Sequence, residues 1–544
     1  MRKKTLSALL RTVAAMAVLT GCGGDKKETA AAPAEGNTTA AVTEAAKTEA
    51  ETTAAVQTEA GGEKNLVMPS ASCVANLNPL LEGYKEAAML NPIYDPLYVI
   101  DVNETRYYLA DSYEVSEDGM QITVKLKEGL KWHDGEAITA DDMIFTMDVC
   151  SDTNNGAGGT NIVILNDQPV KYEKVDDLTV KVTLPMASAS YADLLGGLTL
   201  IPEHVFEGNP SVVSAGEANM KGIGSGPYKV TEFKQDEYLL LEKYEDYYMG
   251  APSIDKVTFR IISDLSAQEV ALMNGEVNFM ELANAPAVAK YEADPNFTVV
   301  KYPEGRVNYL AVNKFCETVQ DPKVVEAVFA ALNRDEIIAG AYGDGMAESA
   351  NSIFSNVNTF YDPSVEGYTQ DVEKAKQLVK ETGLDSKTLT LYFNSERVYM
   401  KESAQIIQQQ LKNVGINLEV IPLESAGFFE KVFGTDGDYE FYLNGYGAVG
   451  DPDQVVAGMY DGTWGVNLAV SDEVSQLWKD ARTVYTPEER AAIYKQIQIQ
   501  TRDELTCYPI AYPNYVFVTT SNIKGADTIK RTPVFEDYTK LTME

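Results

Sequence analysis

Histidine, tryptophan and cysteine are scarce in this chain, which has two His, three Trp and five Cys among 544 residues. Histidine is the usual general base and metal ligand near neutral pH. His133 lies in Lys131-Trp132-His133-Asp134-Gly135 and His204 follows Ile201-Pro202-Glu203, so each has the setting of a structural residue. Neither has a spaced partner, and this disfavours a metal site.

The cysteines are widely separated and show no C-x-x-C spacing, which excludes a local zinc-ribbon or redox motif. If the protein is exported, one or two disulfides are permitted. The sequence does not show which cysteines would pair, and free buried thiols are an equal alternative. The four cysteines after Cys22 are Cys73, Cys150, Cys316 and Cys507.

Catalytic motifs are also lacking: the chain has no G-x-S-x-G elbow, no H-E-x-x-H pair and no P-loop. Asp451-Pro452-Asp453 is a carboxylate pair, but such pairs are expected in so acidic a chain, and we interpret it as a turn. A secreted hydrolase that uses these carboxylates is the enzyme alternative. The sequence therefore predicts a protein that is not an enzyme and binds no cofactor.

Positive charge is in deficit, with 45 Lys and Arg against 81 Asp and Glu and a formal net charge of −36. Such a surface repels nucleic acid and anionic lipid, so neither is an expected partner. The apolar fraction of 45% and the 31 tyrosines indicate a globular protein.

The N-terminus carries the pattern of a lipoprotein signal. Arg2, Lys3 and Lys4 precede a short apolar stretch that ends in Leu19-Thr20-Gly21-Cys22. This pattern predicts a signal peptide with a lipobox over residues 1–22, lipidation of the Cys22 thiol, and a protein anchored to the cell membrane and facing the extracellular side or the periplasm. No later apolar run reaches the eighteen or so residues that span a bilayer.

Residues 23–63 consist mostly of Ala, Thr, Glu and Gly, with few large apolar side chains to bury. Such a segment is expected to stay disordered and to act as a tether, with a reach of roughly 35 Å. The remaining part of the chain is too long for one hydrophobic core, so we expect at least two lobes.

Hydrophobic periodicity predicts two regions of different secondary structure in the globular part, one rich in strands and one in which strands alternate with helices. Period-two alternation predicts strands at 113–115 and 122–126, followed by a helix near Ala140. Clear β runs predict further strands at 238–241 and 257–262. After about Tyr302, strands alternate with helices, including a helix over 373–382 that ends at Gly383 and one that ends at Gly415. This predicts a βαβ layer with a mainly parallel sheet.

A capping box, Thr486 with Glu489, predicts a helix from Pro487 towards Glu504.

Several segments of the chain occur in the same order as the conserved segments of a known protein family. The most specific are Leu109 to Gly119, Leu126 to Gly135, Thr139-Ala140-Asp141-Asp142 and Gly224-Ser225-Gly226-Pro227-Tyr228. Matching segments in the second half are Tyr309 to Asn313, Ala331-Leu332-Asn333-Arg334, Leu411 to Ile416, and Asp451-Pro452-Asp453. This set closely resembles family 5 (peptide/nickel type) of the solute-binding proteins of ABC transporters, over residues 64–544.

The resemblance implies an α/β fold of the type II periplasmic-binding class: two lobes joined by a hinge, with an additional β-rich subdomain in the first lobe. Lobe I would be residues 64–302 and 508–544, and lobe II residues 303–507. The lobes would close around a solute and present it to the transmembrane subunits of an ABC permease. We expect a monomer that captures an oligopeptide, with a sensing or adhesion module as an alternative.

Candidate ligand-binding residues also follow from the resemblance. Arg397 and Tyr399 match an Arg-x-Tyr segment that holds a ligand carboxylate in dipeptide-binding members, a task suited to a guanidinium. Tyr446 matches an aromatic residue that lines the cleft. It could equally be a packing residue, although its expected place in a loop before Gly447 slightly favours binding. The full candidate set is Ser70, Ser72, Cys73, Asn394, Arg397, Tyr399, Asn444, Tyr446, Asp451 and Trp464.

The chain departs from the family pattern after Tyr446. Peptide binders of the family commonly place there an Asp that pairs with the peptide ammonium, whereas this sequence has Gly447-Ala448-Val449-Gly450. A buried ammonium without a counterion costs several kcal/mol. Unless Asp451 or another acid takes this role, the site offers no counterion to the free N-terminus of a peptide. A neutral oligosaccharide or a blocked peptide therefore stays an alternative ligand.

Overall fold

The computed structural model describes residues 63–81, 89–100, 104–212, 216–447, 449–460, 468, 470–528 and 537–544. The predicted signal peptide with Cys22, almost all of the tether, and Trp464 lie outside these residues. No helix within the described ranges is long and apolar enough to cross a membrane.

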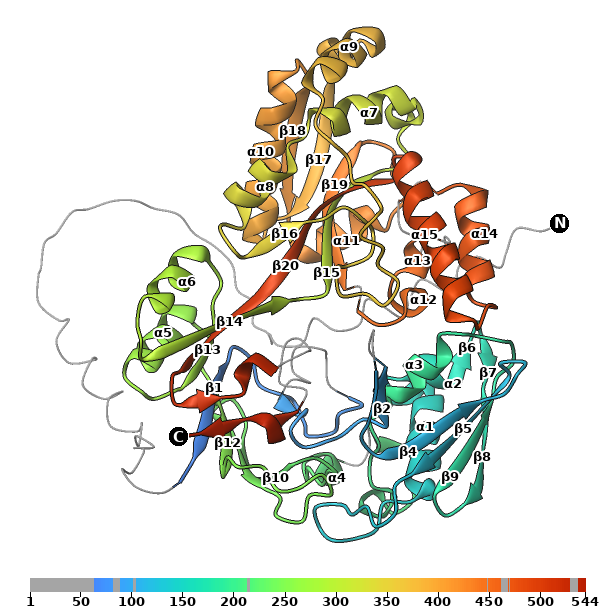
Figure 1. The fold of residues 1–544 in the computed structure, drawn as a ribbon, viewed down its shortest axis with the longest axis vertical. Helices are drawn as coiled ribbons and strands as arrows, with labels where there is room; N and C mark the ends of the chain where they lie inside the picture. Colours follow the sequence, from blue (N-terminus) through green and yellow to red (C-terminus); the bar gives the residue numbers. More distant parts are fainter. Residues whose placement is uncertain are drawn as a thin grey trace, which may run out of the picture. The chain divides into compact units, whose positions relative to one another are not determined.

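Three sheets of four or more strands organise the described chain (Figure 1). The first has the order β1-β12-β11-β10, in which β1 pairs with β12 in parallel and the other pairs are antiparallel. Its strands are β1 (Asn65–Ser70), β12 (Lys256–Ile261), β11 (Tyr238–Lys243) and β10 (Tyr228–Lys234). These bounds confirm the strands predicted at 238–241 and 257–262.

The second sheet is antiparallel, with the order β4-β5-β9-β8. Helix α1 (Ala140–Ser151) contacts it and buries Met143, Met147 and Val149 in the same core as Ile122 and Val124. The strands are β4 (Ala110–Val115), β5 (Gln121–Leu126), β9 (Thr179–Thr183) and β8 (Lys171–Asp176). The strands predicted at 113–115 and 122–126 and the helix near Ala140 are thus confirmed.

The third sheet has eight strands with the order β13-β20-β15-β19-β17-β18, while β14 and β16 also pair with β20. Its strands are β13 (Phe279–Glu281), β14 (Phe297–Pro303), β15 (Arg306–Val312), β16 (Ala347–Ser349), β17 (Thr388–Asn394), β18 (Asn417–Leu423), β19 (Phe441–Gly447) and β20 (Cys507–Thr520). Only the β17/β18 and β17/β19 pairs are parallel.

The prediction of a mainly parallel sheet was therefore wrong. Crossover helices α10 (Val398–Asn413) and α11 (Ser425–Val432) join β17, β18 and β19 and make them parallel. Strand β15 runs antiparallel to both β19 and β20, which come from distant parts of the chain.

Helices cover both faces of this sheet, and the alternation of β15 explains why. Leu310 and Val312 point into one core, whereas Val307, Tyr309 and Ala311 point into the other. The first core is closed by α7 (Pro322–Ala331), α8 (Arg334–Ala341), α9 (Val372–Thr382) and α10. The second is closed by α11, α13 (Ala457–Tyr460), α14 (Asp472–Ala481) and α15 (Pro487–Asp503).

Helix ends test the capping predictions. Helix α9 stops at Gly383 in the left-handed conformation, with φ of 69°, as predicted. Helix α15 begins at Pro487, but the Thr486 side chain caps no backbone N–H, so the predicted capping box is wrong. A complete capping box occurs instead at α1, where Thr139 and Asp142 bond each other's backbone N–H groups.

The remaining elements are short. The strands are β2 (Tyr98–Ile100), β3 (Thr105–Tyr107), β6 (Ile164–Leu165), β7 (Gln168–Pro169), β21 (Ile523–Lys524) and β22 (Thr542–Met543). The helices are α2 (Thr160–Val163), α3 (Tyr191–Gly196), α4 (Gly216–Asn219), α5 (Leu265–Met273), α6 (Ala285–Glu292) and α12 (Pro452–Val455).

Candidate ligand-binding site

The chain crosses twice between two groups of strands in the eight-stranded sheet. Strands β13 and β14 belong to one group, and β15 and β16 belong to the other. Strand β14 leads through Glu304 and Gly305 into β15, and β20 pairs with β15 and β16 through its first half and with β14 and β13 through its second half. The Glu304 N–H donates to the Pro513 carbonyl at 2.9 Å and ties the two passages together. The predicted boundary at residues 302/303 falls within β14, and the one at 507/508 falls at the start of β20.

Arg306 and Asn308 form a polar group at this passage. The Arg306 Nε donates to Asn308 Oδ1 at 3.1 Å and its Nη2 donates to the Gly445 carbonyl at 2.6 Å. Asn308 Nδ2 in turn donates to the Tyr342 hydroxyl at 2.9 Å. Sequence reasoning missed these residues, although a charge and an amide at the start of the buried run Arg306–Val312 were a usable signal.

Arg397 stands at the N-cap position of α10, just after the carboxyl end of β17, and is half-buried. Within the described part of the chain, its guanidinium has no hydrogen-bond or ion-pair partner. Glu304 lies close enough to Arg306 and Arg397 for both cations to lower its pKa, although burial has the larger effect and raises that pKa overall. A half-buried guanidinium with free donors is suited to bind an anion.

Tyr399 extends this group. Its ring lies 5.3 Å from the ring of Tyr342, and its buried hydroxyl has no hydrogen-bond partner among the described residues. The structure therefore brings together the predicted residues Arg397 and Tyr399 with the unpredicted residues Arg306, Asn308 and Tyr342.

Asn394 and Asn444 have different environments. Asn394 is fully buried at the end of β17, where its Oδ1 accepts from the Glu396 N–H and its Nδ2 donates to Ser425 Oγ. It thereby shapes the loop that carries Arg397. Asn444 is half-buried in β19, opposite Tyr309 of β15.

Tyr446 lies within strand β19 rather than in a loop, and 9% of its surface is exposed. Its hydroxyl donates to the Ile353 carbonyl at 2.6 Å. The sequence interpretation left binding and packing open, with a slight preference for binding, and this environment favours packing.

Asp451 begins helix α12 instead of forming a simple turn, because its side chain accepts from the Asp453 N–H at 3.0 Å. Arg490 donates to it through Nη1 at 2.6 Å and through Nη2 at 3.0 Å, and the Tyr494 hydroxyl also contacts it. Asp453 pairs with Arg482 at 2.6 Å. Both acids therefore already have a cationic partner inside the protein.

The loop after β1 carries the remaining predicted residues. The Ser70 hydroxyl donates to the Ser72 carbonyl at 2.7 Å, Ser72 is exposed, and Cys73 is half-buried. Within the described part of the chain, no disulfide joins Cys73, Cys150, Cys316 and Cys507, so the structure favours the reduced alternative left open by the sequence.

The histidines are structural, as interpreted from the sequence. His133 accepts the Gly224 N–H at Nδ1, and its Nε2 lies 3.0 Å from the Gly226 carbonyl. Burial lowers the pKa of His133 to about 4. His204 pairs with Asp134 at 2.8 Å. No group of three or more His, Cys, Asp or Glu within the described residues could hold a metal ion.

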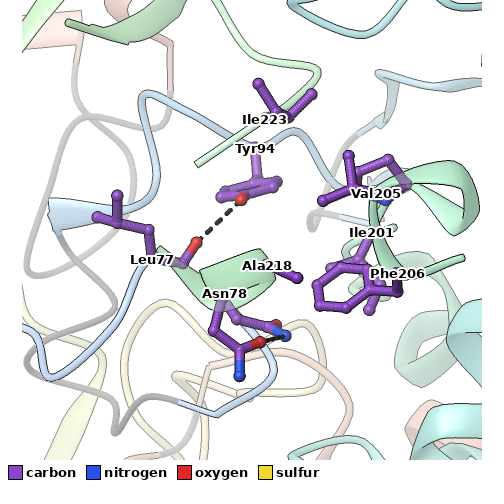
Figure 2. A pocket seen from close by; sticks show the side chains of 10 residues that line it. Leu77, Asn78, Tyr94, Ile201, Val205, Phe206, Ala218 and Ile223 are labelled. Carbon is purple, nitrogen blue, oxygen red and sulfur yellow. Dashed lines mark hydrogen bonds between the residues drawn. The ribbon is translucent and has the colours of Figure 1, made fainter. Parts of the chain in front are cut away.

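A small cavity of about 10 Å³ lies away from the candidate residues (Figure 2). The Tyr94 hydroxyl donates to the Leu77 carbonyl beside it, and Asn78 bonds Asn219. The volume suits about one water molecule, so the cavity cannot hold a transported solute.

Comparisons with known proteins give the family. The sequence model of bacterial extracellular solute-binding proteins, family 5 Middle, matches residues 104–467. The chain belongs to this family. Its members are the solute-binding proteins of ABC importers and not enzymes, so the chain is an extracellular or periplasmic solute-binding protein.

Comparisons with individual relatives support this family assignment. The dipeptide-binding protein of Escherichia coli is 27% identical over 85% of this chain and 92% of its own length. The ABC transporter substrate-binding protein CtaP of Listeria monocytogenes is 32% identical, with a TM-score of 0.83 over 89% of this chain and 100% of that chain. The oligopeptide-binding protein AppA of Bacillus subtilis, solved with a nonapeptide, is 26% identical, with a TM-score of 0.69 over 89% of this chain and 100% of that chain.

These matches confirm the predicted type II periplasmic-binding fold.

Proposed function

We propose that this family 5 protein is a lipid-anchored receptor that captures an oligopeptide between two lobes and delivers it to an ABC permease. The lobes are residues 64–302 with 508–544, and residues 303–507. The observation that carries the ligand class is the half-buried guanidinium of Arg397, which has no hydrogen-bond or ion-pair partner among the described residues.

The chemistry around Arg397 supports a carboxylate ligand. A guanidinium can bind both oxygens of a carboxylate, and the nearby Tyr399 hydroxyl has an unused donor. The peptide-binding names of the Escherichia coli and Bacillus subtilis relatives point to the same ligand class. The C-terminal carboxylate of a peptide is therefore assigned to Arg397.

The test of this assignment uses the purified full-length protein. A thermal-shift screen with di- to pentapeptides, oligosaccharides and nickel selects a peptide, because a ligand of the folded state raises the melting temperature. Calorimetry then compares that peptide with its C-terminal amide. We expect Arg397→Ala to lower affinity for the free acid by about 30-fold or more and to leave the amide little changed.

Arg260→Ala is the matched control, because Arg260 pairs with Glu276 at 3.1 Å on the surface. It should bind the peptide as the wild type does. A response to oligosaccharides without any to peptides would overturn the ligand assignment, and equal losses for acid and amide would overturn the role of Arg397.

The lipid anchor rests on the sequence Leu19-Thr20-Gly21-Cys22. Metabolic labelling with radioactive palmitate should mark the wild-type protein in membranes, whereas Cys22→Ala should carry no label. Label on the Cys22→Ala protein would exclude this anchor.

A further inference from the structure

Helix α3 and helix α12 meet although about 260 residues separate them in the sequence (Figure 1). The Ser190 hydroxyl donates to Asp453 Oδ2 at 3.0 Å, and the Asp451 N–H donates to Asp193 Oδ2 at 2.9 Å. Gln454 Nε2 donates to Ser190 Oγ at 2.7 Å. We call these bonds the α3–α12 contact.

Two neighbouring bonds extend the contact. The Ala189 N–H donates to the Arg482 carbonyl at 2.9 Å, and the Tyr485 hydroxyl lies 3.4 Å from the Gly119 carbonyl. In the proposed lobe division, Gly119 and α3 belong to lobe I, while α12, Arg482 and Tyr485 belong to lobe II. The contact therefore crosses from one proposed lobe to the other.

Two ion pairs hold the lobe II side of the contact in a fixed position. Arg490 holds Asp451 with two hydrogen bonds, and Arg482 holds the buried carboxylate of Asp453 at 2.6 Å. These ion pairs fix α12 and present the Asp451 N–H and the Asp453 carboxylate to α3. Only Ser190, Asp193 and their neighbours must approach when the lobes come together.

Glycines allow the close approach. A Cβ at Gly119 would lie 1.9 Å from the Tyr485 ring, and a Cβ at Gly450 would lie 2.9 Å from Asp193 Oδ2. Both glycines have positive φ, at 65° and 84°. A side chain at either position would have to displace the Tyr485 ring or the Asp193 carboxylate and would so disturb the contact.

We propose that Ser190 and Asp193 are positioning residues for ligand binding: the α3–α12 contact stabilises the closed form by the same amount whatever the solute. This rests on the proposed function, in which closure retains the ligand. A contact that forms only on closure adds to the affinity for every ligand and mainly slows dissociation.

The experiment measures two ligands in five proteins. We expect Ser190→Ala and Asp193→Ala each to weaken binding of the selected peptide and of its C-terminal amide by the same factor, about three- to tenfold, with faster dissociation. The ratio of the two affinities should equal that of the wild type, whereas Arg397→Ala changes it. Ser151→Ala is the control, since Ser151 bonds Met147 within α1.

A second readout is hydrogen exchange in the peptide-bound protein. With the peptide bound, hydrogen exchange of residues 449–456 should be faster in Asp193→Ala than in the wild type, because the Asp451 N–H loses its acceptor. Unequal losses for the two ligands, or unchanged affinity and exchange, would overturn the inference. If the wild type binds another solute of the screen and no peptide, the proposed function fails, while the exchange measurement with that solute bound still decides whether the contact forms in solution.

Discussion

The guanidinium of Arg490 binds the carboxylate of Asp451 through two hydrogen bonds of 2.6 and 3.0 Å, and both side chains are buried. Thirty-nine residues separate them in the sequence. The pair joins α15 to the start of α12, and it explains why the Asp-Pro-Asp segment is structural.

The first prediction concerns this pair. Asp451→Asn should lower the free energy of unfolding by about 3–5 kcal/mol, because the charge of Arg490 is left buried without its partner. Urea denaturation followed by circular dichroism measures the loss. The control is Asp385→Asn, at an exposed position, which should change stability by less than about 0.5 kcal/mol. Equal stabilities of the two variants would contradict the assignment.

The second prediction compares two helix caps. Thr139→Ala should cost about 1 kcal/mol, because Thr139 bonds the Asp141 N–H and forms a capping box with Asp142. Thr486→Ala should cost less, because the Thr486 side chain makes no cap bond. Thermal unfolding of both variants ranks them, and the reverse order would show that α15 has the stronger cap.

The third prediction is a pH dependence. Burial raises the pKa of Asp95 to about 7, although Tyr247 and Tyr248 donate hydrogen bonds to its carboxylate and Lys127 also lowers that pKa. The folded state therefore keeps a proton that the unfolded state releases above about pH 4. Asp95 should destabilise the fold progressively from about pH 4 to pH 7, by on the order of 4 kcal/mol in total.

Asp95→Asn removes this titration and keeps an acceptor for the tyrosines. The stability of the variant relative to the wild type should rise between pH 4 and pH 7 and then level off. Denaturant titrations at both ends of this range measure it, and a difference that does not vary with pH would contradict the raised pKa.

The fourth prediction separates packing from binding at Tyr446. Tyr446→Phe should lower the free energy of unfolding by about 1–3 kcal/mol, because the Ile353 carbonyl loses its donor. Affinity for the selected peptide should stay within about twofold of the wild type, as calorimetry would show. A large loss of affinity at unchanged stability would instead make Tyr446 a ligand contact.

Local patterns predicted most of the fold. The spacing of Ala375, Leu378 and Val379 gave α9, and Gly383 gave its end, because both depend on neighbours in the sequence. The strand directions in the eight-stranded sheet could not be predicted, because β15 and β20 pair across about 200 residues.

The candidate site was predicted only in part. Arg397 and Tyr399 were found by family resemblance, whereas Arg306 and Asn308 join them through tertiary contacts with Gly445 and Tyr342. Ser190 and Asp193 gave no signal, because their partners lie in another part of the chain.

Strand β20 has a consequence for the order in which the protein folds. It occupies residues 507–520 near the end of the chain, yet it pairs with β13, β14, β15 and β16. An extracellular protein that leaves the cell N-terminus first cannot complete this sheet until almost its whole length has emerged. Such late, long-range pairing is slow to form, so the exposed edge of β15 must be kept from aggregating until translocation ends.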